Sequence, residues 1–140
     1  MGRVLLAALV AAVIVFSWGF LAWCVLDLYD LASNPASSPS GAFAELKNPN
    51  VLLRGLAVNF FAAVLMGAII YAGQIKTFAR RYGFVILAAL FAVAATYGAQ
   101  WGWSQVADRW LIVMAIDVLI AWVLAGLPIA GIIKYRPEPR

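Results

Sequence analysis

The chain has 140 residues, of which 66% are hydrophobic and 11% are charged, and its mean hydropathy is +0.95. A soluble domain of this length would lack the polar surface needed to cover its core. The net charge of +4 comes from Lys and Arg in short segments beside apolar stretches, without a basic stripe of interleaved aromatic residues, so the composition predicts a membrane protein and argues against nucleic-acid binding.

Four apolar stretches follow one another along the chain. They predict helices over about 4–26, 52–75, 82–106 and 110–133. About 20 apolar residues rising 1.5 Å each cross a hydrocarbon core of about 30 Å, so each stretch is long enough to span a membrane once. We therefore predict an all-α fold in which residues 1–140 form one domain, an antiparallel bundle of four transmembrane helices.

The first stretch is predicted to be a retained helix. It is longer than the apolar part of a typical signal peptide, and no small-x-small cleavage site closes it. Its Cys24 is the single cysteine of the chain and cannot form an internal disulfide, and the chain has no His. We therefore expect no metal site, no haem and no other cofactor.

The connection between the first two helices is the longest. This predicted outer loop covers 27–50 and is rich in Ser, Pro, Asn and Gly over 33–41, which favours turns. Residues 41–47 are compatible with one short amphipathic turn on the membrane surface, and a linker without structure is the alternative. The other two connections are short and make neighbours of the helices that they join.

Lys and Arg are distributed unequally if the helices alternate in direction. Seven of them fall on one side and three on the other: Arg3, Lys76, Arg80, Arg81, Lys134, Arg136 and Arg140 against Lys47, Arg54 and Arg109. The positive-inside rule then predicts that both termini are cytoplasmic. We expect a multi-pass protein of the bacterial inner (plasma) membrane.

Small residues recur every four positions on two of the central helices. Such spacing lets helix backbones approach closely in lipid. Ala94, Gly98 and Gly102 on the third helix, and Ala63 and Gly67 on the second, are therefore expected at helix contacts. We expect these contacts within the chain, with homodimerisation as the alternative use.

Asp117 is a carboxylate inside the last apolar stretch. Because an ionised carboxylate in hydrocarbon costs about 2.5–3.5 kcal/mol, we expect it to point into the bundle. Counted from the outer helix ends, polar and aromatic side chains gather in the outer half of the membrane. The candidate polar or ligand-binding cluster is Asp117, Arg54, Asn59, Tyr97, Gln100, Trp18 and Trp101. A clasp between helices and a site for a ligand or proton are both open interpretations.

The tryptophans also divide by depth. Trp23, Trp103 and Trp110 fit the aromatic belt at a membrane interface, where an apolar ring and a polar N–H are both accommodated. Three deeper tryptophans are candidates to line a pocket for a flat or cationic ligand: Trp18, Trp101 and Trp122.

Segments 13–19 and 117–127, together with the region of Trp101 and Trp103, resemble a family of small uncharacterised bacterial four-helix integral membrane proteins. The resemblance spans most of the chain and implies the same helical bundle. It implies no activity, since that family has no assigned substrate. The outer loop of this chain departs from the acidic and aromatic loop of the family.

These observations favour a non-catalytic membrane protein, either an accessory subunit or a binder of lipid or another hydrophobic ligand. Its expected partners are membrane lipid and either a larger membrane complex or a second copy of the chain. The alternative is a small proton- or cation-coupled transporter that works as a dimer through Asp117. The chain is similar in size and helix number to small multidrug-resistance exporters, which carry their essential acid on the first helix, where this chain has none.

An enzyme is not expected, and no catalytic residue is assigned. Intramembrane hydrolases and transferases need a nucleophile and a base, or an acidic set that binds a metal. The candidates in this chain are four aspartates without a histidine: Asp27, Asp30, Asp108 and Asp117.

Overall fold

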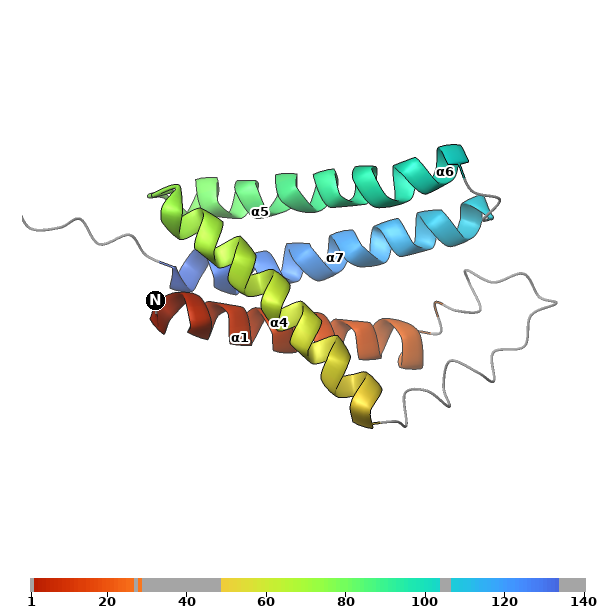
Figure 1. The fold of residues 1–140 in the computed structure, drawn as a ribbon, viewed down its shortest axis with the longest axis horizontal. Helices are drawn as coiled ribbons and strands as arrows, with labels where there is room; N and C mark the ends of the chain where they lie inside the picture. Colours follow the sequence, from red (N-terminus) through yellow and green to blue (C-terminus); the bar gives the residue numbers. More distant parts are fainter. Residues whose placement is uncertain (1, 27, 29–48, 104–106, 134–140) are drawn as a thin grey trace, which may run out of the picture.

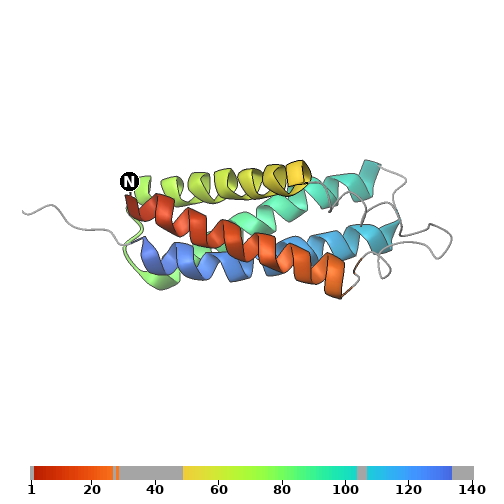
Figure 2. The same ribbon diagram turned by 90° about the horizontal axis from the view of Figure 1, so that it is seen from below.

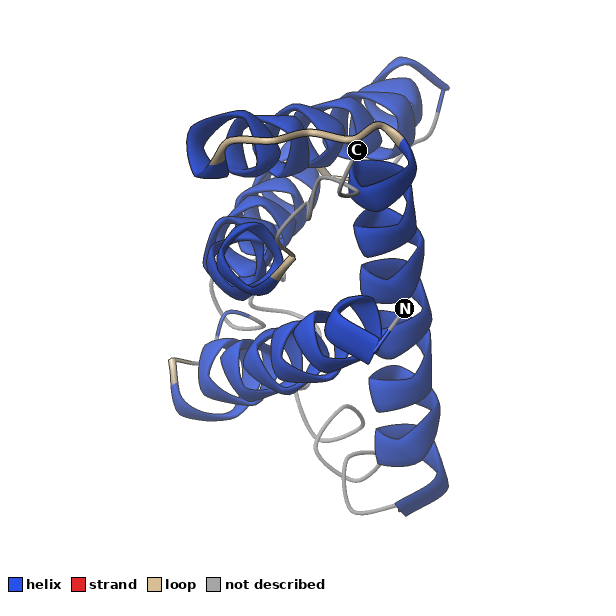
Figure 3. Ribbon diagram, turned by 90° about the vertical axis from the view of Figure 1, so that its left-hand side faces the viewer, coloured by secondary structure: helices blue, strands red, loops and turns tan. Residues whose placement is uncertain are grey.

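The structure, a computed structural model, describes residues 2–26, 28, 49–103 and 107–133. Its helices are α1 (Gly2–Phe20) continued by the π-helical turn η1 (Leu21–Val25), α4 (Pro49–Ala72), α5 (Phe78–Val93) continued by the π-helical turn η2 (Ala94–Gly98) and by α6 (Ala99–Trp103), and α7 (Asp108–Ile132). Most of the expected outer loop over 27–50, including the amphipathic turn at 41–47, lies outside the described residues. Figure 3 shows that the described part of the chain is helical, without a strand.

Within the described residues, four helical segments are long and apolar enough to cross a membrane. They are Gly2–Trp23, Pro49–Ala72, Phe78–Trp103 and Asp108–Ile132. Large apolar side chains cover their outer surfaces; Phe61, Leu87 and Phe91 are 63%, 65% and 74% exposed. Water-soluble monomers rarely expose so much contiguous apolar surface, so the chain is built as a multi-pass membrane protein.

Local sequence accounts for the helix boundaries around the second connection. α4 begins with Pro49, whose fixed φ and missing N–H suit the first helical position. Its end is followed by a tight turn in which Gln74 has a φ of 49°. Thr77 then caps α5, because its hydroxyl accepts a hydrogen bond from the backbone N–H of Arg80. α5 therefore begins at Phe78, before the apolar stretch that starts at 82.

The helices form an open arrangement in which α1 is central. Figure 2 shows α1 between α4 and α7, and α5 packs on the remaining side of α7. α4 crosses α1 and α7 obliquely and approaches α5 mainly near the connection that joins them (Figure 1). Residue 2, the 73–77 connection and residue 133 lie together at one end of the molecule, which we call the turn end.

Alanine and glycine allow the close contacts near the turn end. α1 buries an alanine face against α4 and α7, made of Ala7, Ala8, Ala11 and Ala12. Gly67 of α4 is buried, and a Cβ there would lie 3.0 Å from Val4 Cγ1 and 3.1 Å from Ile133 Cδ1. Ala63, one turn earlier, is 2% exposed. These small residues bring α4 close to α1 and to the end of α7, as association in lipid requires.

The small residues of the third span do not make the close contact expected from their spacing. Ala94, Gly98 and Gly102 are exposed, and a Cβ at either glycine would meet no described atom within 4 Å. Within the single chain, the buried contact of α5 with α7 is made by a different row of residues. That buried row is Arg81, Val85 and Ala89, whereas Ala94 and Gly98 line a cavity between the third span and α7.

Arg81 joins three backbone segments at the turn end. It is 5% exposed, and its Nε donates to the carbonyl of Ala130 at 2.8 Å. Its Nη1 donates to the carbonyls of Ile75 at 3.3 Å and Lys76 at 3.0 Å. Ala130 lies in the last turn of α7, where carbonyls lack helical partners and the helix dipole favours a cation. Arg81 thus fastens the 73–77 connection and α5 to the end of α7.

Candidate functional site

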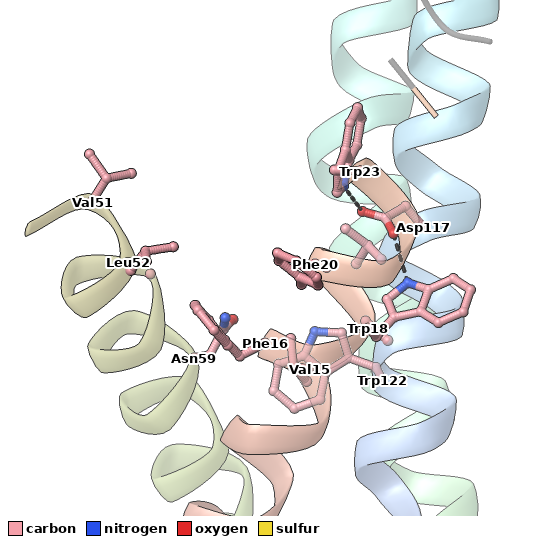
Figure 4. A pocket seen from close by; sticks show the side chains of 14 residues that line it. Val15, Phe16, Trp18, Phe20, Trp23, Val51, Leu52, Asn59, Asp117 and Trp122 are labelled. Carbon is pink, nitrogen blue, oxygen red and sulfur yellow. Dashed lines mark hydrogen bonds between the residues drawn. The ribbon is translucent and has the colours of Figure 1, made fainter. Parts of the chain in front are cut away.

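A cavity of about 500 Å³ opens between α1, α4 and α7, away from the turn end (Figure 4). We call it the tryptophan cavity. Its main side chains are Phe16, Trp18 and Trp23 from α1 and η1, Asn59 from α4, and Asp117 and Trp122 from α7. The cavity exists because α4 diverges from α1 with distance from Gly67, so Val51 and Leu52 form a wall that does not close onto α1.

Asp117 is the polar centre of this cavity. Trp18 Nε1 donates to Asp117 Oδ1 at 2.7 Å, and Trp23 Nε1 donates to Asp117 Oδ2 at 3.1 Å. Each carboxyl oxygen therefore accepts one indole N–H, and both bonds connect α7 with the α1–η1 segment (Figure 4). Lipid would offer the carboxylate no comparable donors, so these bonds are what allow it to lie inside a span.

The π-helical turn η1 explains how two indoles reach one carboxylate. Residues five apart in a regular α-helix point about 140° away from each other, so Trp18 and Trp23 would not share a face. In η1 the N–H of Leu26 bonds the carbonyl of Leu21 at 2.9 Å, five residues back. The wider turn rotates Trp23 back toward the side occupied by Trp18. Such single π turns inside α-helices are frequent at functional sites.

Trp23 is also held from its other side by an aromatic neighbour. Its ring lies 6.1 Å from that of Trp110 on α7, centroid to centroid, with the planes tilted by 51°. Tilted aromatic pairs at this distance are favourable. Trp110 and Asp117 are two helical turns apart on α7, so one face of α7 fixes both the ring and the N–H of Trp23.

The structure brings together three of the seven residues expected in the polar cluster. Trp18, Asn59 and Asp117 line the tryptophan cavity. Arg54 and Gln100 are exposed on the surface of the chain. The remaining two belong to a separate cavity of about 290 Å³ between the third span and α7, lined in part by Tyr97 and Trp101.

Of two further tryptophans at this site, Trp23 lies elsewhere than its sequence position predicts, and Trp122 lies where its depth predicts. Trp23 fits an interfacial belt by its position, and only the π-helical turn brings it onto Asp117. Trp122 lines the tryptophan cavity one turn below Asp117, as its depth in the last span allows. No periodicity in the sequence marks η1, so no signal short of the structure identifies Trp23 as a donor.

The chemistry available at this site is binding by shape and by hydrogen bonds. The walls are mainly aromatic and aliphatic, and Asn59 and Asp117 supply the polar groups. Among the described residues no group of three or more Cys, Asp or Glu side chains is placed to hold a metal ion. In the same residues every buried polar side-chain atom has a hydrogen-bond partner.

Comparisons with models of known protein families, with curated proteins and with solved structures each found no match.

Proposed function

We propose that the protein is a non-catalytic membrane protein that binds a lipid or another hydrophobic molecule in the tryptophan cavity. The observation that carries this proposal is an apolar cavity of about 500 Å³ with a small number of convergent polar groups. Binding sites for small molecules have this size and this composition. The opening between α1 and α4 lies among apolar spans, so the ligand reaches the cavity from the bilayer.

The polar groups give the bound molecule an orientation. Asp117 is fixed by Trp18 and Trp23 at one wall, and Asn59 faces the cavity from α4. A ligand with one hydrogen-bonding group and an apolar body satisfies both parts of the site. Its polar group lies near Asp117 and Asn59, and its apolar part packs on Phe16 and Trp122.

A photoactivatable phosphatidylcholine with a diazirine in its acyl chain tests this proposal in proteoliposomes. We expect labelling of cavity residues in addition to the outer surface of α5. Gly55→Leu fills the cavity without a clash, because a Cβ at Gly55 meets no described atom within 4 Å. It should remove the cavity labelling and leave that of α5, whereas Gly102→Leu, at an exposed position of α6 outside the cavities described, should change neither. Cavity labelling that survives Gly55→Leu would refute the proposal.

A small proton- or cation-coupled transporter that works as a dimer through Asp117 is the second candidate. It is favoured by the position of the carboxylate, which faces a cavity rather than a closed helix contact. In proteoliposomes with a pH gradient, this reading predicts proton flux that Asp117→Asn abolishes. A binder without transport predicts no flux from either protein.

We propose further that the four spans form an antiparallel bundle in the bacterial inner membrane with both termini cytoplasmic. The support is the distribution of seven basic residues on one side and three on the other. Large exposed apolar side chains on the third span, with Trp101 at 71% and Trp103 at 92%, offer a face to lipid, to a second copy or to a larger membrane complex.

A further inference from the structure

A second cavity, of about 550 Å³, lies at the turn end between the 73–76 connection and the first turns of α5. We call it the basic cavity. Two cationic residues, Lys76 and Arg80, stand at its mouth, and Phe84 and Leu87 form its apolar wall. It is separate from the tryptophan cavity and shares no residue with it.

α5 divides its residues between two faces at this end. One face, with Arg81, is buried on α7, and Arg81 uses its guanidinium on backbone carbonyls. The other face carries Arg80, Gly83, Phe84 and Leu87, which share a side of the helix by their spacing. Adjacent arginines thus have different environments: Arg81 is buried, and Arg80 is exposed at the basic cavity.

The polarity of the basic cavity changes along the direction that crosses the membrane. Lys76 lies in the connection between two spans, and Arg80 lies in the first turn of α5. Leu87 is about 10 Å further along the helix axis. Cations at the membrane surface and apolar side chains one to two turns deeper match the two parts of an anionic phospholipid, whose phosphate lies above its acyl chains.

Gly83 opens the wall of α5 between these two parts. A Cβ at Gly83 would meet no described atom within 4 Å, so the space beside the helix backbone is empty of protein. α4 and α5 contact each other little, and no residue of α4 lines the basic cavity, so the face of α5 with Gly83, Phe84 and Leu87 is not covered by α4.

We propose that the basic cavity binds one anionic phospholipid, with its phosphate on Lys76 and Arg80 and an acyl chain along Gly83, Phe84 and Leu87. Basic pockets between spans are a known way to hold anionic headgroups. Each cation near an anionic membrane surface contributes about a fivefold increase in affinity, so the two together contribute roughly thirtyfold over a neutral lipid of the same chains.

Native mass spectrometry of the full chain in a neutral detergent tests the proposal, with dioleoyl phosphatidylglycerol and dioleoyl phosphatidylcholine as probes. We expect one tightly retained phosphatidylglycerol and no comparable retention of phosphatidylcholine. Lys76→Gln and Arg80→Gln should each lower the affinity about fivefold. Arg3→Gln is the matched control, since Arg3 is exposed at the same end but does not line the cavity.

A variant that fills the basic cavity distinguishes binding inside the cavity from general attraction of anionic lipid to the basic residues at the turn end. Gly83→Leu keeps every charge and should abolish preferential retention of phosphatidylglycerol while leaving the unfolding temperature unchanged. Equal losses with Arg3→Gln and Arg80→Gln, equal retention of the two lipids, or full retention by Gly83→Leu would each overturn the proposal. Displacement of the lipid by inorganic phosphate at millimolar concentration would assign the cavity to a free anion and also overturn it.

Discussion

Replacement of Asp117 by Asn is a sharp probe of the tryptophan cavity. Asp117→Asn keeps the size of the side chain and exchanges one acceptor oxygen for an NH2 donor. In the structure both oxygens accept an indole N–H, from Trp18 at 2.7 Å and from Trp23 at 3.1 Å. After the substitution one indole N–H faces a donor. We expect the amide oxygen to stay on Trp18, whose bond is the shorter.

The cost can be bounded from the two hydrogen bonds. A buried donor left without an acceptor costs about 1–3 kcal/mol. Measured hydrogen bonds between transmembrane helices average about 0.6 kcal/mol and reach about 1.7 kcal/mol. Both indoles are only partly buried and border a cavity, so the lower part of the first range applies. We therefore expect Asp117→Asn to lower the free energy of unfolding by about 1–2 kcal/mol.

A double-mutant cycle measures the effect and identifies the bond that is lost. The free energy of unfolding is obtained by titrating sodium dodecyl sulfate into mixed micelles. In the native background Trp18→Phe and Trp23→Phe should each destabilise by about 1 kcal/mol. Combined with Asp117→Asn, Trp18→Phe should keep its cost and Trp23→Phe should cost less than about 0.5 kcal/mol. Equal costs in the combined variants, or no destabilisation by Asp117→Asn alone, would refute the hydrogen-bond arrangement.

Three further predictions concern the turn end. Arg81→Gln should lower the free energy of unfolding by about 2–4 kcal/mol, because three carbonyls lose a charged donor. Arg80→Gln is the control and should change the same free energy by less than about 0.5 kcal/mol. Gly67→Leu should lower the free energy of unfolding by about 1–3 kcal/mol, because its side chain would overlap Val4 and Ile133. Gly98→Leu, where a Cβ meets no described atom within 4 Å, is the control. Equal unfolding transitions of the two variants would contradict the close packing at Gly67. Ala79→Cys, in a chain without the native cysteine, should react with an impermeant maleimide only after cells are permeabilised; labelling of intact cells would reverse the proposed orientation.

The existence of four apolar helices is readable from the sequence because lipid imposes length and composition on each span. The start of α5 is less readable. Because Arg80 and Arg81 are charged, the apolar stretch of the sequence begins only at residue 82. The helix itself begins at Phe78, where Thr77 caps it. Hydropathy shows only where the charged residues end and the apolar residues begin. The start of the helix depends on the hydroxyl of Thr77 and on the carbonyls that accept hydrogen bonds from Arg81.

The candidate site is readable only in part, for geometric reasons. That Asp117 needs donors follows from the cost of a carboxylate in hydrocarbon, and Trp18 is near it in depth. The role of Trp23 depends on the π-helical turn, which changes the face of every later residue and leaves no mark on composition. Gly98 illustrates the reverse case, because its spacing is typical of a close helix contact but a cavity separates it from α7.

Because α4 diverges from α1, a small tilt of α4 would change the width of the tryptophan cavity. Gly67 packs closely on Val4 and Ile133, and Leu52 lies about 22 Å from it along the helix axis. A tilt of about 5° moves Leu52 by about 2 Å at that arm length. The bonds of Asp117 to Trp18 and Trp23 join only α1, η1 and α7, so they are untouched by such a tilt. In the proposed binding site, the width of the tryptophan cavity and the position of Asn59 therefore depend on α4, whereas the hydrogen bonds of Asp117 do not.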